Sequence, residues 1–259
     1  VTVDINEKNP EEVTYTLTAT ITDGDKTLTS SWDCVVPAVP ATSPKDILDA
    51  AYALQPGESL ADAVTLTGIV ASIDSAYSEQ YGNITVTIFV EDMLDKPVQC
   101  FRLTGEGAKD IAFGDNITVT GILKNYNGTI EFDAGCTLDA RMSMIDIVDA
   151  GYALEAGKAM DRAYTLIGVI TSVDTPYSEQ YGNITVTIAV PGCEDKPFQC
   201  FRLKGEGAAE LTAGYMVAVY GTLKNYNGTI EFDAGCALLD YAAPESEEPE
   251  PETLTIPEA

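Results

Sequence analysis

The chain contains one long internal repeat, and this repeat constrains its fold more than any other feature. The twelve residues Tyr77–Ile88 and the thirteen residues Lys124–Cys136 both return unchanged 100 residues later. A shift of 100 aligns residues 46–139 with 146–239 without a gap, and 57 of the 94 aligned pairs are identical. Solenoid repeats have shorter units of roughly 20–50 residues. The period therefore predicts an internal duplication of a whole domain.

Alternating apolar and polar residues predict short β-strands inside each copy. Ile84, Val86 and Ile88, for example, alternate with threonines. A glycine inside the first strand, Gly68 with its counterpart Gly168, indicates a bend or a bulge. In the first copy we expect strands at 64–74, 83–90, 97–103, 116–124 and 129–134, a loop at 77–82, and one or two helical turns at 105–111.

A short helix is predicted ahead of the strands in each copy. Ser43 is placed to cap it, with Pro44 in the first turn and Asp46 at the third helical position; Ser143 and Asp146 repeat the cap. Three strands, a helical turn and two more strands within about 75 residues follow the order of an OB-fold. The predicted fold class is all-β with short helices, built from two tandem five-stranded OB-fold-like Greek-key barrels.

Two of the repeated motifs resemble those of OB-like modules that occur in tandem within large secreted bacterial surface proteins. The first is Tyr-Ser-Glu-Gln-Tyr-Gly-Asn at 77–83, and the second is Lys-Asn-Tyr-Asn-Gly-Thr at 124–129. The resemblance covers about residues 44–240. It implies an extracellular or cell-surface location and further modules beside these two.

The N-terminal part predicts a β-hairpin. Val13–Ile21 alternates, Asp23-Gly24 provides a turn, and Lys26–Val36 continues as a second strand. Two strands cannot close a sandwich alone. The segment resembles the last two strands of a bacterial immunoglobulin-like domain.

The chain is thereby divided into five segments. They are the C-terminal hairpin of an incomplete immunoglobulin-like (Ig-like) domain at 1–40, OB-fold-like repeats at 44–140 and 143–240, an acidic Pro/Glu linker at 241–252, and the start of a further module at 253–259.

Composition excludes several classes of function. The chain has 41 acidic and 14 basic residues and no histidine. The net charge of -27 repels phosphate backbones and anionic membranes, and no run of about 18 apolar residues predicts a membrane span. Without histidine, Ser-His-Asp catalysis, Cys-His catalysis and histidine-bound zinc are excluded. We expect a monomeric, non-catalytic protein without a cofactor or metal.

The six cysteines leave two interpretations open. They contain no C-x-x-C pair, so a zinc knuckle or a redox pair is not expected. Four of them form a repeated pair, which can be reduced core residues or one disulfide per copy, Cys100–Cys136 and Cys200–Cys236, as in proteins outside the cytosol. Inward-facing Phe101 and Leu103 would turn Cys100 outward, which counts against the disulfide.

OB-folds bind ligands on the face of strands two and three, flanked by the loops after strands one and four. The identical stretches of the two copies fall on those loops. Tyrosines, amides and cations there can stack on a sugar ring or a base and hydrogen-bond its edges. The alternative is that the tyrosines pack against the barrel and Asn127-Gly128 forms a turn. The predicted ligand-binding residues are Tyr77, Tyr81, Phe101, Arg102, Lys124, Asn125 and Tyr126, with Tyr177, Tyr181, Phe201, Arg202, Lys224, Asn225 and Tyr226.

The predicted function is a binding or spacer module of a secreted or cell-surface multidomain bacterial protein, with a polysaccharide or a surface protein as partner. The alternative is an accessory single-stranded nucleic-acid module of an extracellular nuclease. A nucleic-acid groove needs a positive lining, whereas residues 46–140 hold four basic and fifteen acidic side chains. Charge therefore ranks nucleic acid second.

Overall fold

The computed structural model describes residues 13–36 and 43–244. It has two compact units, of which the first contains the N-terminal hairpin and the second contains both repeats. The predicted module start at 253–259 and most of the predicted linker at 241–252 lie outside the described residues. No helix in the described part of the chain is both long and apolar enough to cross a membrane.

The N-terminal hairpin is confirmed. Strands β1 (Val13–Asp23) and β2 (Lys26–Val36) pair antiparallel from Val13↔Val36 to Asp23↔Lys26, and Gly24 takes a positive φ of 58° in the turn. Membership of an immunoglobulin-like domain stays a prediction.

Both repeats are built from the same elements in the same order. The first contains α1 (Pro44–Tyr52), β3 (Val64–Ser78), β4 (Asn83–Val90), β5 (Val98–Leu103), the 3-10 turn η1 (Ala108–Asp110), β6 (Asn116–Gly121), β7 (Leu123–Tyr126), β8 (Thr129–Phe132) and β9 (Thr137–Met142). The second contains α2 (Met144–Tyr152), β10 (Tyr164–Ser178), β11 (Asn183–Ala189), β12 (Phe198–Leu203), β13 (Met216–Gly221), β14 (Leu223–Tyr226), β15 (Thr229–Phe232) and β16 (Ala237–Ala242).

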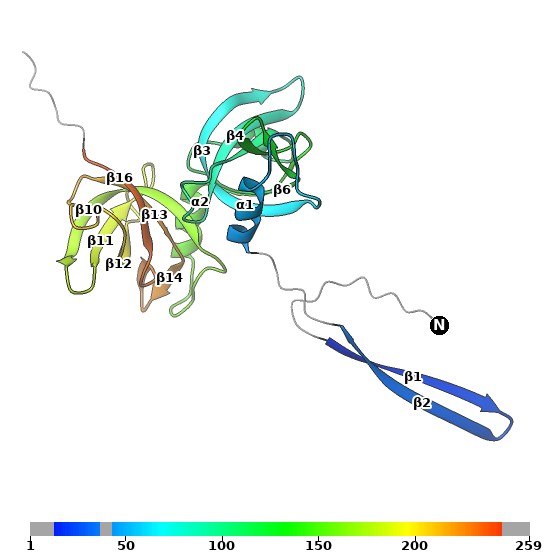
Figure 1. Ribbon diagram of the computed structural model, residues 1–259. Coiled ribbons are helices and arrows are strands. Elements are labelled where there is room, and N and C mark those ends of the chain that lie inside the picture. Colours follow the sequence, from blue (N-terminus) through cyan, green and yellow to red (C-terminus); the bar gives the residue numbers. More distant parts are fainter. Residues whose placement is uncertain (1–12, 37–42, 245–259) are drawn as a thin grey trace, which may run out of the picture. The chain divides into compact units, whose positions relative to one another are not determined.

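The strand order confirms two OB-fold barrels. In the first sheet it is β7-β8-β5-β4-β3-β6-β9. Strands β6 and β7 form one long strand bent at Ile122, and it pairs antiparallel with the broken strand β8–β9. Because β6 also pairs with β3, and β8 pairs in parallel with β5, the sheet closes on itself (Figure 1). Every pairing recurs in the second sheet.

Two predicted strand boundaries were wrong. Strand β3 runs on to Ser78, which pairs with Asn83, so the first loop is a short turn at 79–82. The predicted fifth strand continues after a break as β9. The predicted helical segment is confirmed in the first repeat as a single 3-10 turn. The prediction ended strands at glycines and polar residues, whereas hydrogen-bonded pairing with the neighbouring strand decides where a strand ends.

Gly68 is explained by close packing rather than by a bend. A Cβ added to Gly68 would lie 2.4 Å from the carbonyl oxygen of Phe89, and one added to Gly168 would lie 2.9 Å from that of Ala189. The backbones of the first two barrel strands therefore approach too closely for any side chain at this position.

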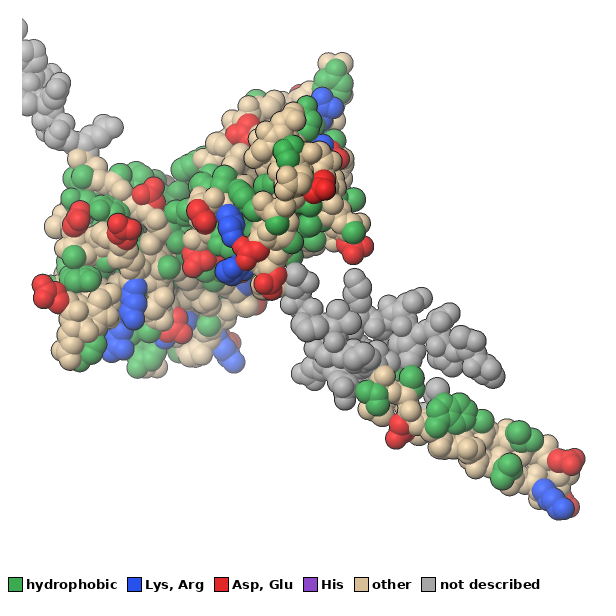
Figure 2. Space-filling view, viewed as in Figure 1, with side chains coloured by type: hydrophobic (Ala, Val, Ile, Leu, Met, Phe, Trp, Pro, Cys, Tyr) green, Lys and Arg blue, Asp and Glu red, His purple; other side chains and the backbone are tan. Residues whose placement is uncertain are grey.

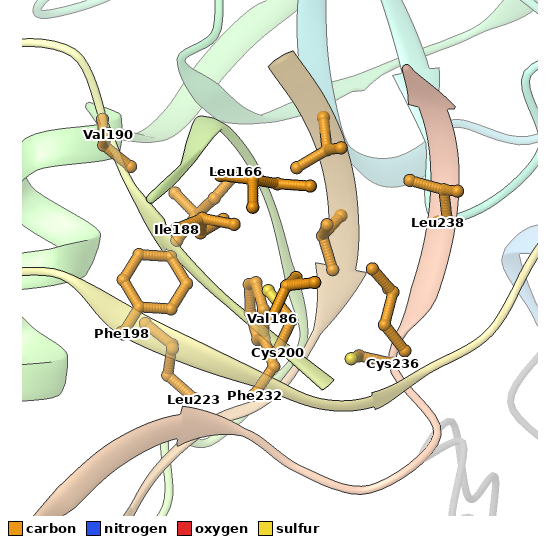
Figure 3. Packing of buried hydrophobic residues seen from close by; sticks show 14 of the residues in the cluster. Leu166, Val186, Ile188, Val190, Phe198, Cys200, Leu223, Phe232, Cys236 and Leu238 are labelled. Carbon is orange, nitrogen blue, oxygen red and sulfur yellow. The ribbon is translucent and has the colours of Figure 1, made fainter. Parts of the chain in front are cut away.

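Each barrel encloses an apolar core that its helix helps to cover. In the second barrel, Phe198, Phe232 and Leu223 point toward one another (Figure 3) and are almost entirely buried. Leu48 of α1 and Ile147 of α2 are fully buried. The predicted helix caps are present: Ser43 Oγ accepts from the Asp46 amide at 3.1 Å, and Ser143 repeats this contact.

The two repeats are joined by very little chain. Strand β9 ends at Met142 and α2 begins at Met144. The buried Asn116 side chain donates to the carbonyl of Thr165 at 2.9 Å and accepts from its amide at 3.2 Å. This two-point contact ties the first residue of β6 in the first barrel to the first strand of the second.

Candidate ligand-binding face

A β-bulge in the third barrel strand places an arginine in an unusual backbone conformation. Ile84 pairs with Leu103 and Val86 pairs with Cys100, so β5 holds one extra residue between the two pairs. Arg102 takes a φ of 52°, and Arg202 a φ of 54°. A bulge of this kind redirects a side chain.

The bulge also resets which residues face the core. Cys100 and Leu103 are both fully buried, while Phe101 is half-buried on the outer side and Arg102 is exposed. The expectation that inward-facing Phe101 and Leu103 turn Cys100 outward was therefore wrong. The regular alternation on which it rested is interrupted at Phe101–Arg102.

Arg102 stacks on the outward-facing ring of Phe101. Its guanidinium carbon lies 4.9 Å from the ring centroid, and Arg202 lies at the same distance over Phe201. Left-handed backbone costs a non-glycine residue about 1–2 kcal/mol. Both repeats keep an arginine where glycine would be unstrained, and such strain gathers at functional sites.

In the second barrel, an open hollow lies next to Arg202. It has a volume of about 450 Å³, within the range of small-ligand sites. The ring of Tyr181 stands at its edge and is 65 % exposed. Asn183 Nδ2 donates to the Tyr181 carbonyl at 3.3 Å, which helps fix the turn. The lining residues are Tyr181, Asn183, Arg202, Lys204, Ala234 and Gly235.

Lys124 is held in a structural ion pair. Its Nζ lies 3.2 Å from Oε1 of Glu131 and 2.6 Å from Oδ1 of Asp133, and Lys224 repeats both contacts. The hydrogen bond to Asp133 raises the pKa of Lys124. The Glu131 side chain is only 5 % exposed, so the lysine supplies the counter-charge of a buried carboxylate.

Asn125 is likewise committed to the fold. Its Nδ2 donates to the carbonyl of Leu54 at 2.8 Å, and its Oδ1 accepts from the amide of Gly128 at 2.7 Å. Asn127 and Gly128 have φ values of 53° and 98°, as a tight hairpin turn requires. The Asn-Gly motif is thus turn chemistry, and Asn125 joins that turn to the segment after α1.

The predicted tyrosines differ in exposure. Tyr177 packs against the core of its barrel, and Tyr77 is half-buried at the same position. Tyr81 is 70 % exposed and Tyr126 is 58 % exposed. Of the predicted tyrosines, only Tyr81 and Tyr126, with their counterparts Tyr181 and Tyr226, have rings that are open to a ligand.

Strand register divides the predicted residues into two groups. Lys124 pairs with Glu131, which pairs with Gln99. Arg102 lies three residues further along β5, whereas Tyr126 lies two residues the other way along β7. At about 3.3 Å per residue, Arg102 and Tyr126 are roughly 15 Å apart along the strands. Phe101 and Arg102 therefore form one group, and Lys124 and Tyr126 form another. Tyr81 is assigned to the first group because its counterpart Tyr181 lines the same hollow as Arg202.

Sequence reasoning missed Asp74 and Thr87, which form a polar row with Gln99 across the face between these groups. Asp74 Oδ2 accepts from Thr87 Oγ1 at 2.8 Å and from Gln99 Nε2 at 3.0 Å. Asp174 makes the same contacts at 2.7 and 3.0 Å. The retention of all three residues in both copies was the available signal. Asn183, Lys204 and the Ala234–Gly235 turn in the hollow were also missed.

The buried cysteines are unsuited to nucleophilic chemistry. All six are free thiols in the structure, so neither predicted disulfide is formed there. Cys136 Sγ instead donates to the carbonyl of Phe101 at 3.6 Å. Burial raises the pKa of Cys136 to about 12, and that of Cys100 well above its usual value. Among the described residues, no group of three or more Cys, Asp or Glu side chains is placed to hold a metal ion.

The Arg102→Gly and Arg202→Gly variants are expected to change the free energy of unfolding by less than about 1 kcal/mol. Relief of left-handed strain, worth about 1–2 kcal/mol, offsets the lost stacking and the greater freedom of glycine. Arg102→Ala keeps the strain and serves as the control, with lower stability than Arg102→Gly by about 1 kcal/mol. Urea unfolding measures both. A loss above about 2 kcal/mol in the glycine variant would show that the arginine is structural.

Comparisons with known proteins do not assign the chain to a family. No protein-family model matches it, and no curated protein does. Among solved structures, a deletion mutant of the single-stranded DNA binding protein from Thermus aquaticus matches with 20 % sequence identity, over 75 % of this chain and 98 % of that chain. The TM-score is 0.25. The fold assignment rests instead on the strand order described above.

Proposed function

We propose that each barrel is a non-catalytic binding module that holds a polysaccharide against Tyr81 and Arg102, or Tyr181 and Arg202, within a secreted or cell-surface multidomain bacterial protein. The observation that carries the proposal is a strained arginine and an exposed tyrosine, which occur in both repeats and together line the hollow of the second. An aromatic face with hydrogen-bond donors at its edge suits a sugar ring, which is apolar on one face and polar around its rim.

Charge and size favour a glycan over the other partners. Acidic side chains are scattered over the face shown in Figure 2, and the chain carries a net charge of -27, which opposes a nucleic-acid strand. The hollow is small enough for one or two sugar residues, whereas a protein partner needs a broader surface. The absence of histidine and the protonated, buried thiols support a non-catalytic role.

The double variant Tyr81→Ala/Tyr181→Ala is expected to weaken retention on a polysaccharide. Each stacking tyrosine contributes about 1–3 kcal/mol by analogy with base stacking, which corresponds to roughly 5- to 150-fold in affinity. The measurement is affinity electrophoresis in gels that contain cellulose derivatives, xylan, pectin or mannan, with single-stranded oligothymidylate in parallel.

The matched control is Tyr126→Ala/Tyr226→Ala, which removes two rings of similar exposure at the other end of the face. This control should retain the parent affinity. The proposal fails if no polysaccharide retards the parent protein, or if the control variant loses affinity while the Tyr81 variant keeps it. Stronger retention by oligothymidylate would favour the nucleic-acid alternative.

A further inference from the structure

The positions that line the hollow of the second barrel differ from their counterparts in the first barrel in one charged residue. The second barrel has Lys204 beside Arg202, and the first has Thr104 beside Arg102. The other lining positions are identical in the two copies, from the tyrosine to the Ala-Gly turn. The second hollow therefore holds two cations where the corresponding positions of the first supply one.

The backbone at the differing position is the same in both barrels. The amide of Thr104 donates to the carbonyl of Cys136 at 3.2 Å, and that of Lys204 donates to Cys236 at 3.0 Å. The Thr104 hydroxyl also donates to the Cys136 carbonyl at 3.2 Å. Thr104 is thus turned back onto its own barrel, whereas the Lys204 side chain is exposed.

Among the described residues that line the hollow of the second barrel, none supplies a counter-charge to its two cations. No acidic side chain lines this hollow, and within residues 43–244 neither Arg202 nor Lys204 forms a salt bridge, in contrast to Lys224 and Lys196. Lys204 also borders a separate hollow, which is lined in part by Asp92 and Asp95 of the first repeat. It is ion-paired with neither of these carboxylates. These cations are therefore available to an anionic group of a ligand.

We propose that the second barrel binds a sugar that carries a carboxylate, while the first binds a neutral sugar of the same polymer. This inference rests on the proposed function. The carboxylate lies between Arg202 and Lys204 while the ring stacks on Tyr181, and the arginine fork suits a carboxylate geometrically. Residues 146–240 hold thirteen acidic and six basic side chains, so an isolated acidic sugar is better matched than a polyanion.

The test uses the full chain and two probes that differ in charge and by one methyl group: the disaccharide of glucuronic acid and glucose, and its methyl ester. Tyr81→Ala removes the first site, so that calorimetric titration reads the second site alone. The acid should bind about tenfold more tightly than the ester, and Lys204→Thr should abolish that preference. In a Tyr181→Ala background, Thr104→Lys should create the same preference in the first barrel.

The outcomes separate this inference from the proposed function. Equal binding of acid and ester, or no binding of either, overturns the inference while tyrosine-dependent retention on polysaccharide still supports the function. Tighter binding of oligothymidylate than of the acid, dependent on Lys204, overturns the inference in favour of phosphate. If Asp92→Asn/Asp95→Asn removes the effect of Lys204→Thr, the lysine acts on those carboxylates and the inference also fails. Thermal unfolding of every variant confirms that the fold is intact.

Discussion

Lys124→Met is expected to lower the free energy of unfolding by about 3 kcal/mol, because it leaves the buried Glu131 carboxylate without its counter-charge. Glu131 is 5 % exposed, while the lysine itself is 20 % exposed, so the expected loss lies at the lower end for a broken buried pair. The measurement is urea unfolding followed by far-UV circular dichroism. Fluorescence is unsuitable because the single tryptophan, Trp32, lies on the hairpin.

Two controls identify the cause of this loss. Lys124→Met/Glu131→Leu removes both charges and should recover most of the stability. Lys96→Met breaks a pair with Asp49, whose side chain is 43 % exposed, and should cost less than about 1 kcal/mol. If Lys96→Met proves as damaging as Lys124→Met, burial of the carboxylate is not the reason.

The second partner of Lys124, Asp133, predicts a sensitivity to acid. The hydrogen bond from Lys124 lowers the pKa of Asp133 below its ordinary value of 3.8. The contribution of this pair is therefore fully present above pH 3.8 and is lost as pH falls through the lowered value in the folded state.

Phe232→Ala is expected to destabilise the second barrel by about 4 kcal/mol, and Phe132→Ala the first by about 3 kcal/mol. Both rings are fully buried. Phe232 also meets Phe198 edge to face, with centroids 5.3 Å apart and an interplanar angle of 88°, and such pairs add about 0.5–1.5 kcal/mol. The first barrel has Val98 at the position of Phe198.

The same unfolding measurement compares the two variants. Phe198→Val should bring the cost of Phe232→Ala close to that of Phe132→Ala, because it recreates the first core in the second barrel. An equal loss for both Phe→Ala variants in the parent would show that the aromatic pair contributes nothing beyond its buried area.

The repeat and the alternating strands made the architecture predictable, because the alternation of apolar and polar residues along each strand identifies the face that packs in the core. The candidate site was only partly predictable. Tyr81 and Arg102 were predicted as exposed residues of one barrel face, but nothing local to Arg102 reveals a bulge, because arginine has no preference for positive φ. The role of Lys124 depends on Glu131 and Asp133 across the hairpin. Lys204 is only two residues from Arg202 in the sequence, but only the fold shows that both line one hollow.

The sequence identity between the copies has a consequence for how the chain reaches its native state. Strand β4 contains the segment Asn83–Ile88, and β11 repeats it unchanged 100 residues later. The energies of native strand pairing therefore hardly distinguish a barrel's own strand from the equivalent strand of the other barrel. Tandem domains of this kind are prone to exchange strands during folding. Joining β4 to β12 instead of β5 closes a loop longer by 100 residues, which costs roughly 2 kcal/mol. Phe198 would also overpack a core shaped around Val98, adding about 1–3 kcal/mol. The few differences between the copies thus help keep each strand in its own barrel.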